Sequence, residues 1–215
     1  MITHSIMLTD STPVVGPTYR MAEALKLRFE EEINRLLEAG VLRECISPYR
    51  SPIIVLEKAD KSLRLVCDYK QINLKTVDDL YQMTDPYDVL CNAAGKRFIS
   101  KIDLTKAFYQ IGLDENCQDF TAFSCFLGSF CFTRASMGLK NSPRTMQRAM
   151  DIILRGTSKY AKTLLDDIVI YSSSFEEHLN HIRDILVRLR RANMTASISK
   201  SEFLLQSMTI LGHNL

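Results

Sequence analysis

The sequence predicts an α+β protein in which antiparallel strands pack on helices. The chain has 215 residues, of which 46% are hydrophobic, enough to bury the core of one large domain or two small ones. Segments with the apolar spacing of helices alternate with short apolar runs typical of strands. Two of these runs flank a short charged connection, which indicates an antiparallel hairpin and favours this class over a doubly wound parallel sheet.

The N-terminal part is predicted to hold a helix followed by a hairpin. Apolar residues recur at three- and four-residue steps over residues 21–37, and Gly40 stands where a helix C-terminal cap is expected, so the helix should end near Ala39. A proline-punctuated connection follows. The apolar runs 53–56 and 63–69 then predict a hairpin, because the residues between them form a charged tip.

The rest of the chain predicts a strand, two helices and a final strand or hairpin. The strand covers residues 97–104. Ser142 is expected to supply an N-cap and Pro143 a first-turn residue for the next helix, whose apolar residues lie on one side. A second helical stripe covers 175–189, and residues 209–215 suit a strand or the start of a hairpin.

Composition restricts the possible classes of function. The chain has 27 Lys and Arg against 25 Asp and Glu, a net charge of +2, so total charge does not indicate a nucleic-acid partner. No apolar run approaches the length of a membrane span, and the N-terminus lacks the basic-then-apolar order of a signal peptide. We therefore expect a protein of the cytosol or nucleus without a membrane partner.

Cysteine and histidine form no recognisable disulfide or metal pattern. The sequence has no CxxC pair, so we expect free buried thiols in a reducing compartment. His178 and His181 stand three residues apart, and because no third ligand lies nearby in sequence we expect a solvated helix face rather than a metal site. The six cysteines are Cys45, Cys67, Cys91, Cys117, Cys125 and Cys131.

Two adjacent aspartates, Asp166 and Asp167, lie inside the apolar stretch LLDDIVIYS at 164–172. The same dipeptide at 78–79 lies in a polar stretch, where a solvated turn explains it. Asp166 and Asp167 instead have apolar residues on both sides, as expected where two strands meet in a tight hairpin. A type I′ turn with solvent-exposed acids explains this local pattern equally well.

A third carboxylate favours a functional interpretation. Asp103 lies near the end of the strand predicted at 97–104, and it converges with the hairpin aspartates if the two strands are neighbours. Three carboxylates at close range repel one another, and a divalent cation is the usual remedy. Magnesium held by carboxylates and substrate phosphates suits nucleotidyl transfer. If Asp103 is adjacent, the sequence therefore predicts a two-metal polymerase site.

The order of these segments resembles the reverse transcriptase of gypsy-type LTR retrotransposons, from about Pro17 to Leu215. Residues 31–58 (EEINRLLEAGVLRECISPYRSPIIVLEK) resemble the family's lead into the fingers strands. The resemblance implies a right-hand polymerase fold whose palm is a ferredoxin-like antiparallel sheet packed on helices, with the thumb absent. The fingers would comprise residues 1–78 and 111–141, and the palm residues 79–110 and 142–215, ending within the primer-grip hairpin.

The segment KADKSLRLVCDYKQIN at 58–73 resembles the family's lysine-rich fingertip and its VDYRxLN pattern. By that likeness Lys58 and Arg64 bind the triphosphate of the incoming deoxynucleotide, since a charged hairpin can close over phosphates and neutralise them. A solvated hairpin tip is the alternative that the local sequence leaves open.

The segment KIDLTKAFYQIGL at 101–113 resembles the family's first catalytic motif. The resemblance implies that Asp103 is a metal ligand and that the backbone carbonyl of Leu104 is a further ligand. It places the ring of Phe108 beneath the incoming sugar, where a bulky group would exclude a 2′-hydroxyl. An ordinary core aromatic is the alternative for Phe108.

The segment MGLKNSPRTMQRAM at 137–150 resembles the family's FGLxNAPxxFQRxM segment. Met137 and Gly138 would border the incoming nucleotide, although Met137 replaces the usual phenylalanine and Ser136 the usual proline. The resemblance and the local positive charge also imply contacts with the nucleic acid, while the helix spacing would equally suit a solvated face. The expected contacts are Lys140, Asn141, Arg144, Gln147 and Arg148.

The aspartate pair corresponds by resemblance to the family's YxDD box. Asp166 and Asp167 would then be catalytic metal ligands together with Asp103. Leu164 stands in place of the tyrosine, beside the primer or template, so the hydroxyl expected there is missing.

Two further motifs lie near the C-terminus. SKSEF at 199–203 resembles the family's KKCEF segment, which places Lys200 near the leaving pyrophosphate. ILGHNL at 210–215 resembles the start of the primer-grip hairpin, of which only the first strand is expected in the chain. Leu211 and Gly212 are accordingly expected to contact nucleic acid.

The resemblance implies an RNA-directed DNA polymerase core that adds deoxynucleotides to a primer 3′-hydroxyl with two Mg²⁺ ions, for which Mn²⁺ can substitute. Its partners would be an RNA or DNA template with primer and deoxynucleoside triphosphates. If the chain is a fragment of a retrotransposon polyprotein, the thumb, connection and ribonuclease H regions would also be partners. The expected location is a retrotransposon particle in the cytoplasm, or the nucleus.

Two alternatives stay open. The first is a catalytically weak or inactive, host-adopted RNA-binding or interaction module derived from a reverse transcriptase. The second is another metal-dependent nucleotidyl transferase, such as a cyclase, on a similar palm, against which the hairpin with Lys58 and Arg64 argues. The first alternative rests on the departures from the family pattern at Leu63, Ser136, Met137 and Leu164.

Overall fold

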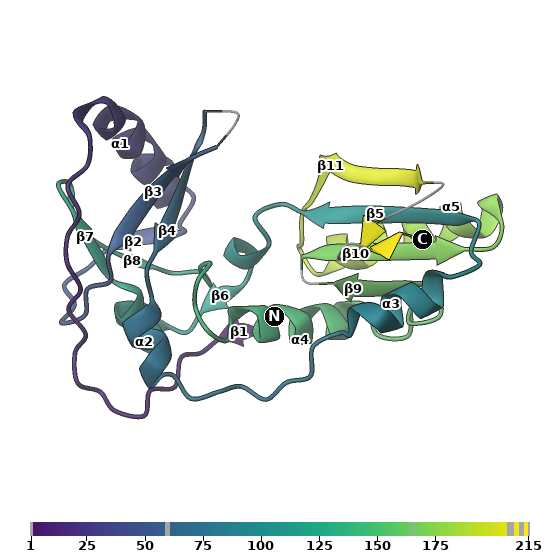
Figure 1. Ribbon diagram of the computed structural model, residues 1–215, viewed down its shortest axis with the longest axis horizontal. Coiled ribbons are helices and arrows are strands. Elements are labelled where there is room, and N and C mark those ends of the chain that lie inside the picture. Colours follow the sequence, from purple (N-terminus) through teal and green to yellow (C-terminus); the bar gives the residue numbers. More distant parts are fainter. Residues whose placement is uncertain (1, 59–60, 165, 206–208, 211–212, 215) are drawn as a thin grey trace. The chain divides into compact units, whose positions relative to one another are not determined.

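The computed structural model describes residues 2–58, 61–164, 166–205, 209–210 and 213–214 (Figure 1). The chain divides into two compact units, each assembled from segments far apart in sequence. The first unit comprises Ile2–Asp79 and Phe108–Ser142, and the second comprises Leu80–Ala107 and Pro143–Leu215.

The first unit holds two α-helices, a three-stranded antiparallel sheet in the order β2-β8-β7, a two-stranded hairpin and a short parallel pair. Its helices are α1 (Glu23–Glu38), α2 (Lys70–Lys75) and the 3₁₀ segments η1 (Ala107–Gln110), at the unit boundary, and η2 (Glu115–Thr121). Its strands are β1 (Thr3–His4), β2 (Leu42–Glu44), β3 (Ile53–Glu57), β4 (Leu63–Cys67), β6 (Gly112–Leu113), β7 (Phe123–Cys125) and β8 (Gly128–Phe132).

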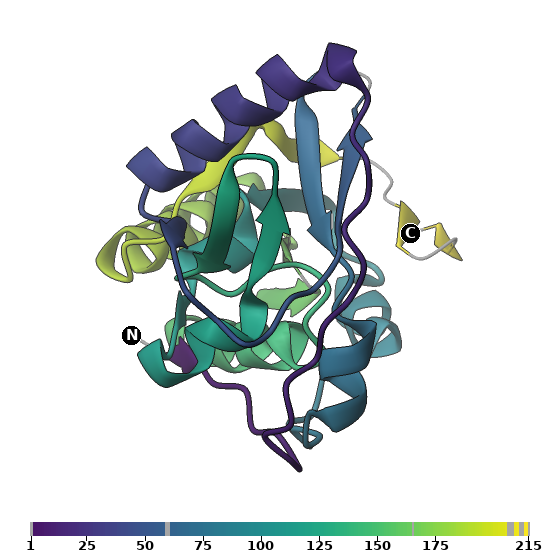
Figure 2. The same ribbon diagram turned by 90° about the vertical axis from the view of Figure 1, so that its left-hand side faces the viewer.

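Helix α1 forms where the apolar spacing predicts it. Phe29, Ile33 and Leu36 are buried because they recur on one side of the helix, and they join a core that includes the aromatic rings of β7 and β8. The chain leaves the helix through Ala39 and Gly40, so the predicted end is confirmed. Figure 2 shows α1 and the β7–β8 hairpin of this unit.

The predicted hairpin at 53–69 is also confirmed. Strands β3 and β4 pair antiparallel, with Ile53 opposite Cys67 and Glu57 opposite Leu63. Ile53, Leu63 and Leu65 are buried in the core of the first unit, whereas Ile54 and Leu56 are exposed, so only one face of the hairpin is covered.

The second unit is a four-stranded antiparallel sheet in the order β11-β5-β10-β9, with helices on both faces. A short terminal hairpin, β12 with β13, follows it. The strands are β5 (Phe98–Leu104), β9 (Ala161–Leu164), β10 (Asp167–Ser172), β11 (Ala196–Leu205), β12 (Thr209–Ile210) and β13 (His213–Asn214). The helices are α3 (Pro86–Ala93), α4 (Ser142–Ile153) and α5 (Phe175–Arg191).

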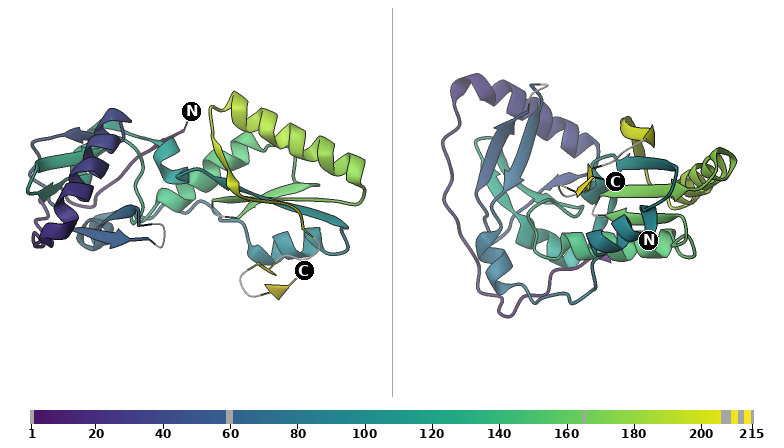
Figure 3. Two further views of the ribbon diagram at one scale, coloured as in Figure 1. Left: turned by 90° about the horizontal axis from the view of Figure 1, so that it is seen from above. Right: turned by 45° about the vertical axis from the view of Figure 1, so that its right-hand side comes forward.

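The two faces of this sheet are covered by different helices. Side chains alternate along a strand, and Ile99, Val169 and Tyr171 pack with Val89 and Ala93 of α3. The alternate positions of β5 and β10 face α5, and α4 lies on that side too (Figure 3). Because both faces are packed, β10 contains the continuous buried run Ile168–Tyr171, whereas β5 also carries the polar residues Ser100, Lys101 and Asp103.

Two boundary expectations need correction. Ser142 is the first residue of α4 rather than its N-cap, and its hydroxyl donates to the carbonyl of Ser136 at 3.2 Å. Near the C-terminus, Thr209 pairs with Asn214 and Ile210 with His213, so both strands of a hairpin are present where only the first was expected. None of the helices within the described residues combines the length and apolar character that a membrane crossing needs.

The expectation of a solvated histidine pair on α5 is wrong for His178, whose ring is fully buried. Its Nε2 lies 2.8 Å from the hydroxyl of Ser100 and its Nδ1 lies 2.8 Å from that of Ser172. The Ser172 hydroxyl also lies 2.8 Å from Nδ1 of half-buried His181, which stacks on Tyr160. Burial of the His178 ring costs little free energy because both ring nitrogens have hydrogen-bond partners. The pattern of polar and apolar residues in the sequence does not indicate that Ser100 and Ser172 are these partners.

His178 also changes which residues of α5 are buried. Ile185 and Leu189 are buried with His178, whereas Phe175, Leu179 and Leu186 of the predicted stripe are exposed by 44–49%. The helix is therefore rotated from the orientation that its apolar residues alone predict.

The expectation that all six thiols are free and buried is also wrong. Cys45 and Cys131 form a disulfide, with Cα atoms 5.9 Å apart. Antiparallel pairing of β2 with β8 brings together two residues that are 86 positions apart, and no sequence spacing indicates it. Of the remaining cysteines, Cys67 and Cys117 are buried, Cys125 is half-buried and Cys91 is exposed.

Replacing His178 with glutamine should reduce the loss of stability in acid. Burial lowers the pKa of His178, whereas an unfolded histidine titrates near about 6.5. The unfolded state therefore binds more protons below about pH 6.5, and the stability present at neutral pH is lost as the pH falls towards the folded-state pKa. Urea unfolding at about pH 7.5 and about pH 5 measures this; an unchanged pH dependence in His178→Gln would contradict a neutral buried ring.

Reduction of the disulfide should lower the free energy of unfolding by about 2–4 kcal/mol, because the open chain regains entropy when it unfolds. Cys45→Ala should lose the same amount, and dithiothreitol should have no further effect on that variant. Cys91→Ala is the matched control, since Cys91 is free and exposed. Urea unfolding with and without dithiothreitol gives the comparison, and equal midpoints for the wild type would show that the bond contributes nothing.

Candidate active site

The three predicted acids lie at one end of the sheet in the second unit. Strand β10 pairs with β5 in a register that sets Asp167 directly opposite Asp103. Asp167 also pairs with Leu164 across the β9–β10 hairpin, and the Leu104 amide donates to the Asp166 carbonyl at 3.3 Å. The two strands are therefore neighbours, as the convergence of the acids requires, and the predicted tight hairpin is confirmed.

Burial and the neighbouring charges both shift the pKa of Asp167. Burial raises the pKa of its carboxyl, and the nearby carboxylates of Asp166 and Asp103 raise it further. The ammonium of Lys101 opposes this shift, since its Nζ lies 2.7 Å from Oδ2 of Asp167. The hydrogen bond to Asp167 likewise raises the pKa of Lys101. The site thus concentrates negative charge and already contains one cation.

The donor set suits a divalent cation. Carboxylates are ligands that Mg²⁺ accepts, and burial, with a further contribution from repulsion by Asp166 and Asp103, raises the pKa of Asp167. Across the described residues, no three or more His, Cys, Asp or Glu side chains stand ready to hold a metal ion. Asp167 is instead paired with Lys101. The residues fit such an ion in kind, and the strand register places Asp103 opposite Asp167.

Two of the residues expected near the incoming nucleotide touch within the first unit. The guanidinium of Arg64 on β4 contacts the sulfur of Met137. Lys58 stands exposed at the end of the same hairpin, where its amide donates to the Ser62 carbonyl at 2.9 Å. Phe108 lies in η1 of this unit and is half-buried, so it is not a fully enclosed core ring.

Gly138 follows Met137 in a backbone conformation that favours glycine. Its φ is +96°, and a Cβ there would lie 3.2 Å from the carbonyl oxygen of Cys67 and 3.5 Å from the ring of Tyr69. The backbone can therefore approach β4 closely. Gly138 borders a cavity of about 660 Å³ that lies within the first unit and is lined mainly by apolar surface, including Ile54 and Leu74.

Asn73 positions this loop, a role that sequence reasoning did not assign. Its side-chain amide donates to the Gly138 carbonyl at 2.8 Å, and its carbonyl oxygen accepts from the Lys140 amide at 2.9 Å. Asn73 is the last residue of the DYKQIN segment. The resemblance of that segment to the family pattern is the signal in the sequence that could have indicated a role for Asn73. One side chain of α2 thus fixes both ends of the Gly138–Lys140 turn.

The predicted nucleic-acid contacts around residue 140 already have partners within the first unit. Lys140 Nζ lies 3.0 Å from both the Asp78 carboxylate and the Thr76 carbonyl. The Asn141 side chain donates to the Val77 carbonyl at 2.8 Å and accepts from the Asp79 amide at 3.2 Å. Both side chains therefore stabilise the loop that leaves α2.

The predicted contacts on α4 differ in accessibility. Gln147 is only 1% exposed; its amide donates to Asp151 at 2.9 Å, and its buried carbonyl oxygen has no hydrogen-bond partner among the described residues. Arg148 is half-buried, with its guanidinium 4.5 Å from the ring centre of Tyr81. Arg144 is half-buried as well, so neither arginine lies on a fully solvated face.

The remaining predicted residues are near β9, β11 and the C-terminus. Leu164, which replaces the expected tyrosine, is half-buried and packs against the α3 side of the sheet with Val169. Lys200 is exposed on β11, where the pairing with β5 shifts register. Leu211 and Gly212 lie outside the described residues.

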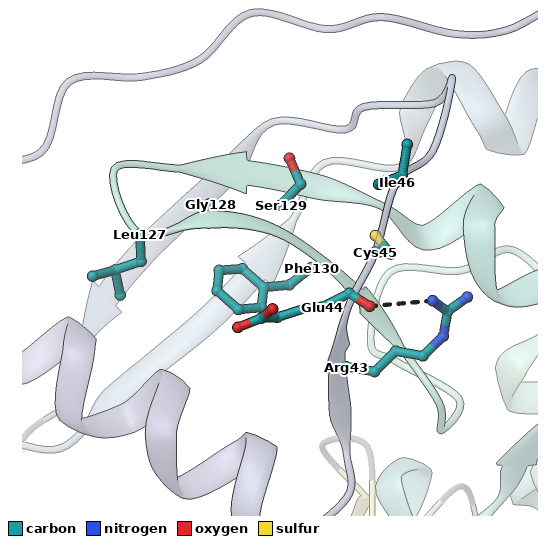
Figure 4. Close-up of a pocket in the computed structure, with 8 residues that line it drawn as sticks. All are labelled: Arg43, Glu44, Cys45, Ile46, Leu127, Gly128, Ser129 and Phe130. Carbon is teal, nitrogen blue, oxygen red and sulfur yellow. Dashed lines mark hydrogen bonds between the residues drawn. The ribbon is translucent and has the colours of Figure 1, made fainter.

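A separate cavity of about 480 Å³ lies beside the disulfide in the first unit (Figure 4). Arg43, Cys45 and Phe130 are among the residues that line it, and the Arg43 guanidinium donates to the Glu44 carbonyl at 3.3 Å. None of the predicted catalytic or binding residues lines this cavity.

A family model described as reverse transcriptase (RNA-dependent DNA polymerase) matches residues 56–215, most of the chain. The chain belongs to the reverse transcriptase family. The resemblance inferred from the motif order is therefore confirmed. The chain is also similar to curated proteins over nearly its whole length.

It is 36% identical over 218 residues to the retrovirus-related Pol polyprotein from transposon 297 of Drosophila melanogaster, an alignment that covers 99% of the chain and 21% of that relative. It is 33% identical to the polyprotein from transposon gypsy of the same fly, covering 98% of the chain and 21% of the relative. The reverse transcriptase chain thus spans about a fifth of the length of these relatives.

Solved structures confirm the fold class. A crystal structure of the Prototype Foamy Virus protease-reverse transcriptase CSH mutant matches with a TM-score of 0.90 at 23% identity, over 99% of this chain and 29% of that one. The foamy viral protease-reverse transcriptase dRH in complex with double-stranded DNA matches with a TM-score of 0.89 at 26% identity, over 100% and 38%. The mixed helices and antiparallel sheets of this chain therefore belong to the fold class predicted from sequence.

Gly138→Ala should destabilise the first unit by roughly 2–3 kcal/mol, because it adds a contact with β4 to the strain of a positive φ. Gly95→Ala is the matched control: Gly95 has φ +73° but no atom within 4 Å of the position that a Cβ would take, so it should lose only about 1–2 kcal/mol. Urea unfolding measures both. Equal losses would mean that the close approach to Cys67 does not constrain residue 138.

Proposed function

We propose that this chain is the catalytic core of an RNA-directed DNA polymerase, adding deoxynucleotides to a primer 3′-hydroxyl on an RNA or DNA template. The observation that supports it most directly is the register that sets Asp103 opposite Asp167, with Asp166 next to it in the hairpin. A carboxylate cluster alone would suit many metal-dependent reactions. Membership of the reverse transcriptase family is the reason to propose nucleotidyl transfer among them.

In this proposal the first unit is the fingers and the second unit is the palm. Lys58 and Arg64 are cationic side chains at the end of an exposed hairpin, suited to a triphosphate. Phe108, Met137 and Gly138 are assigned to the sugar and base of the incoming nucleotide. The half-buried ring of Phe108 can exclude a 2′-hydroxyl by size.

Asp103, Asp166 and Asp167 would hold two Mg²⁺ ions, or Mn²⁺ in their place, with the carbonyl of Leu104 as a further ligand. When bound, such ions lower the pKa of an attacking hydroxyl and neutralise charge on the phosphates. The chain's own contribution is to fix the carboxylates: the β5–β10 register holds Asp103 opposite Asp167, and Asp166 directly precedes β10. Lys200 is assigned to the side of the leaving pyrophosphate.

The nucleic-acid partner is proposed from charge and from relatives. Structures of the foamy viral protease-reverse transcriptase are described with double-stranded DNA and with an RNA/DNA hybrid, at 26% identity to this chain. We assign the contacts with template and primer to the residues that the family resemblance indicates. These are Lys140, Asn141, Arg144, Gln147, Arg148, Leu164, Leu211 and Gly212.

Primer extension tests the proposal. Purified chain, primed homopolymer RNA, the matching deoxynucleoside triphosphate and Mg²⁺ or Mn²⁺ should give extended primer that chelation abolishes. Asp103→Asn, Asp166→Asn and Asp167→Asn should each lower the rate by roughly a hundredfold or more, because each removes charge at the reacting phosphate. Gel analysis of labelled primer over time gives the rates.

Asp88→Asn is the control for a lost aspartate, since Asp88 is exposed on α3 in the same unit and is not one of the three acids. It should extend primer like the wild type. If the wild type binds primed RNA but never extends it with either metal, the chain is a nucleic-acid-binding module and the polymerase proposal fails.

A further inference from the structure

Lys101 stands among three acidic side chains on one face of the sheet. Its ammonium pairs with Asp167 on β10 at 2.7 Å. Asp103 lies two positions further along β5, hence on the same face, and Glu202 is the cross-strand partner of Lys101 on β11. Lys101 is therefore within electrostatic range of all three, with the carboxylate of Asp167 as its present partner.

This position conflicts with a divalent cation on Asp167. An ammonium held on a carboxylate oxygen and a metal ion ligated by the same group repel each other at short range. The Lys101–Asp167 pair is only partly exposed, with side-chain exposures of 33% and 22%, so solvent screens this repulsion incompletely. Lys101 therefore weakens the ligation of a metal ion by Asp167 as long as its ammonium stays on Oδ2 of that carboxylate.

Glu202 offers a second partner at little cost. It is exposed on β11, and the register of β11 shifts on both sides of it. The flexible stem of lysine can turn from one neighbouring strand to the other without a change in the backbone of β5. The ammonium of Lys101 can therefore pair with either of two carboxylates, that of Asp167 on β10 or that of Glu202 on β11.

We propose that Lys101 is an internal counter-ion that occupies Asp167 in the metal-free site and transfers to Glu202 when a divalent cation binds. The inference rests on the proposed role of the three aspartates as metal ligands. Lys101 acts through Asp167 and is thus a positioning residue. Its positive charge partly compensates the negative charge of the aspartates before substrate binds. It also weakens the binding of a divalent cation in the absence of substrate.

Direct Mn²⁺ titration of the full chain tests the first half of this mechanism. Lys101→Met removes the competing charge and should bind Mn²⁺ roughly tenfold more tightly than the wild type, as expected for loss of a partly screened unit charge. Lys101→Arg keeps a cation and should resemble the wild type. Free Mn²⁺ can be followed by electron paramagnetic resonance, a readout that needs no catalysis.

Lys162→Met is the matched control. Lys162 lies on the neighbouring strand β9 and is also ion-paired, with Asp88 at 3.4 Å, so it reports the effect of deleting a lysine from this unit. Its Mn²⁺ affinity should stay within about twofold of the wild type, since its ammonium pairs with Asp88 and not with one of the three aspartates. Equal affinities of Lys101→Met and wild type, or equal gains in both methionine variants, would overturn the proposal.

A double-mutant cycle with Glu202→Gln tests the transfer. With Lys101 present, loss of Glu202 should weaken Mn²⁺ binding by a few fold, because Lys101 has no second partner. In the Lys101→Met background the same change should have almost no effect. Additive effects would show that Glu202 acts only as a distant charge, and would overturn the transfer step.

The two proposals can fail separately. If the Mn²⁺ results hold while the wild type never extends a primer, the counter-ion mechanism stands and the polymerase function fails. If primers are extended but Lys101→Met binds Mn²⁺ like the wild type, only the counter-ion mechanism fails. Urea unfolding of each variant confirms that the affinities refer to folded protein.

Discussion

The register of β10 against β5 determines where the acidic residues of this domain lie. Side chains alternate between the two faces of a strand, so a slip of one residue would move Asp167 to the α5 face, where Ile102 is buried, and would turn Ile168 and Ile170 away from that face. Packing excludes that slip, because both faces of the central strands are covered by helices. The position of the acids is thus a consequence of the hydrophobic core beside them.

The same two strands are joined at their other end by a buried polar contact. His178 of α5 reaches Ser100 on β5 and Ser172 on β10, so one side chain fixes both strands and the helix above them. Such a network is specific as well as stabilising, since any shift in register would leave its groups unpaired in the core. The register of β10 against β5 therefore determines both the position of the aspartates at one end of the two strands and the His178 hydrogen bonds at the other end.

Sequence reasoning succeeded where the signal is local. The end of α1, the β3–β4 hairpin and the turn that carries Asp166 follow from apolar spacing, glycine and turn residues within a few positions, and motif order indicated the family. It failed where residues meet only after folding: Cys45 with Cys131, His178 with its two serines, Asn73 with the Gly138 turn, and Lys101 with Asp167. Each of these contacts depends on strand or helix pairing between distant segments, which no pattern along the chain encodes.

The disulfide has a topological consequence. The chain leaves the first unit after Asp79, builds α3 and β5 of the second unit, and returns at Phe108. Cys45 and Cys131 lie on either side of this excursion and both belong to the first unit. The strand that carries Asp103 is therefore part of a covalently closed ring. A single backbone cut between Leu80 and Ala107 would leave the two pieces of the chain tethered, so the strand that carries Asp103 could be cut without either piece diffusing away.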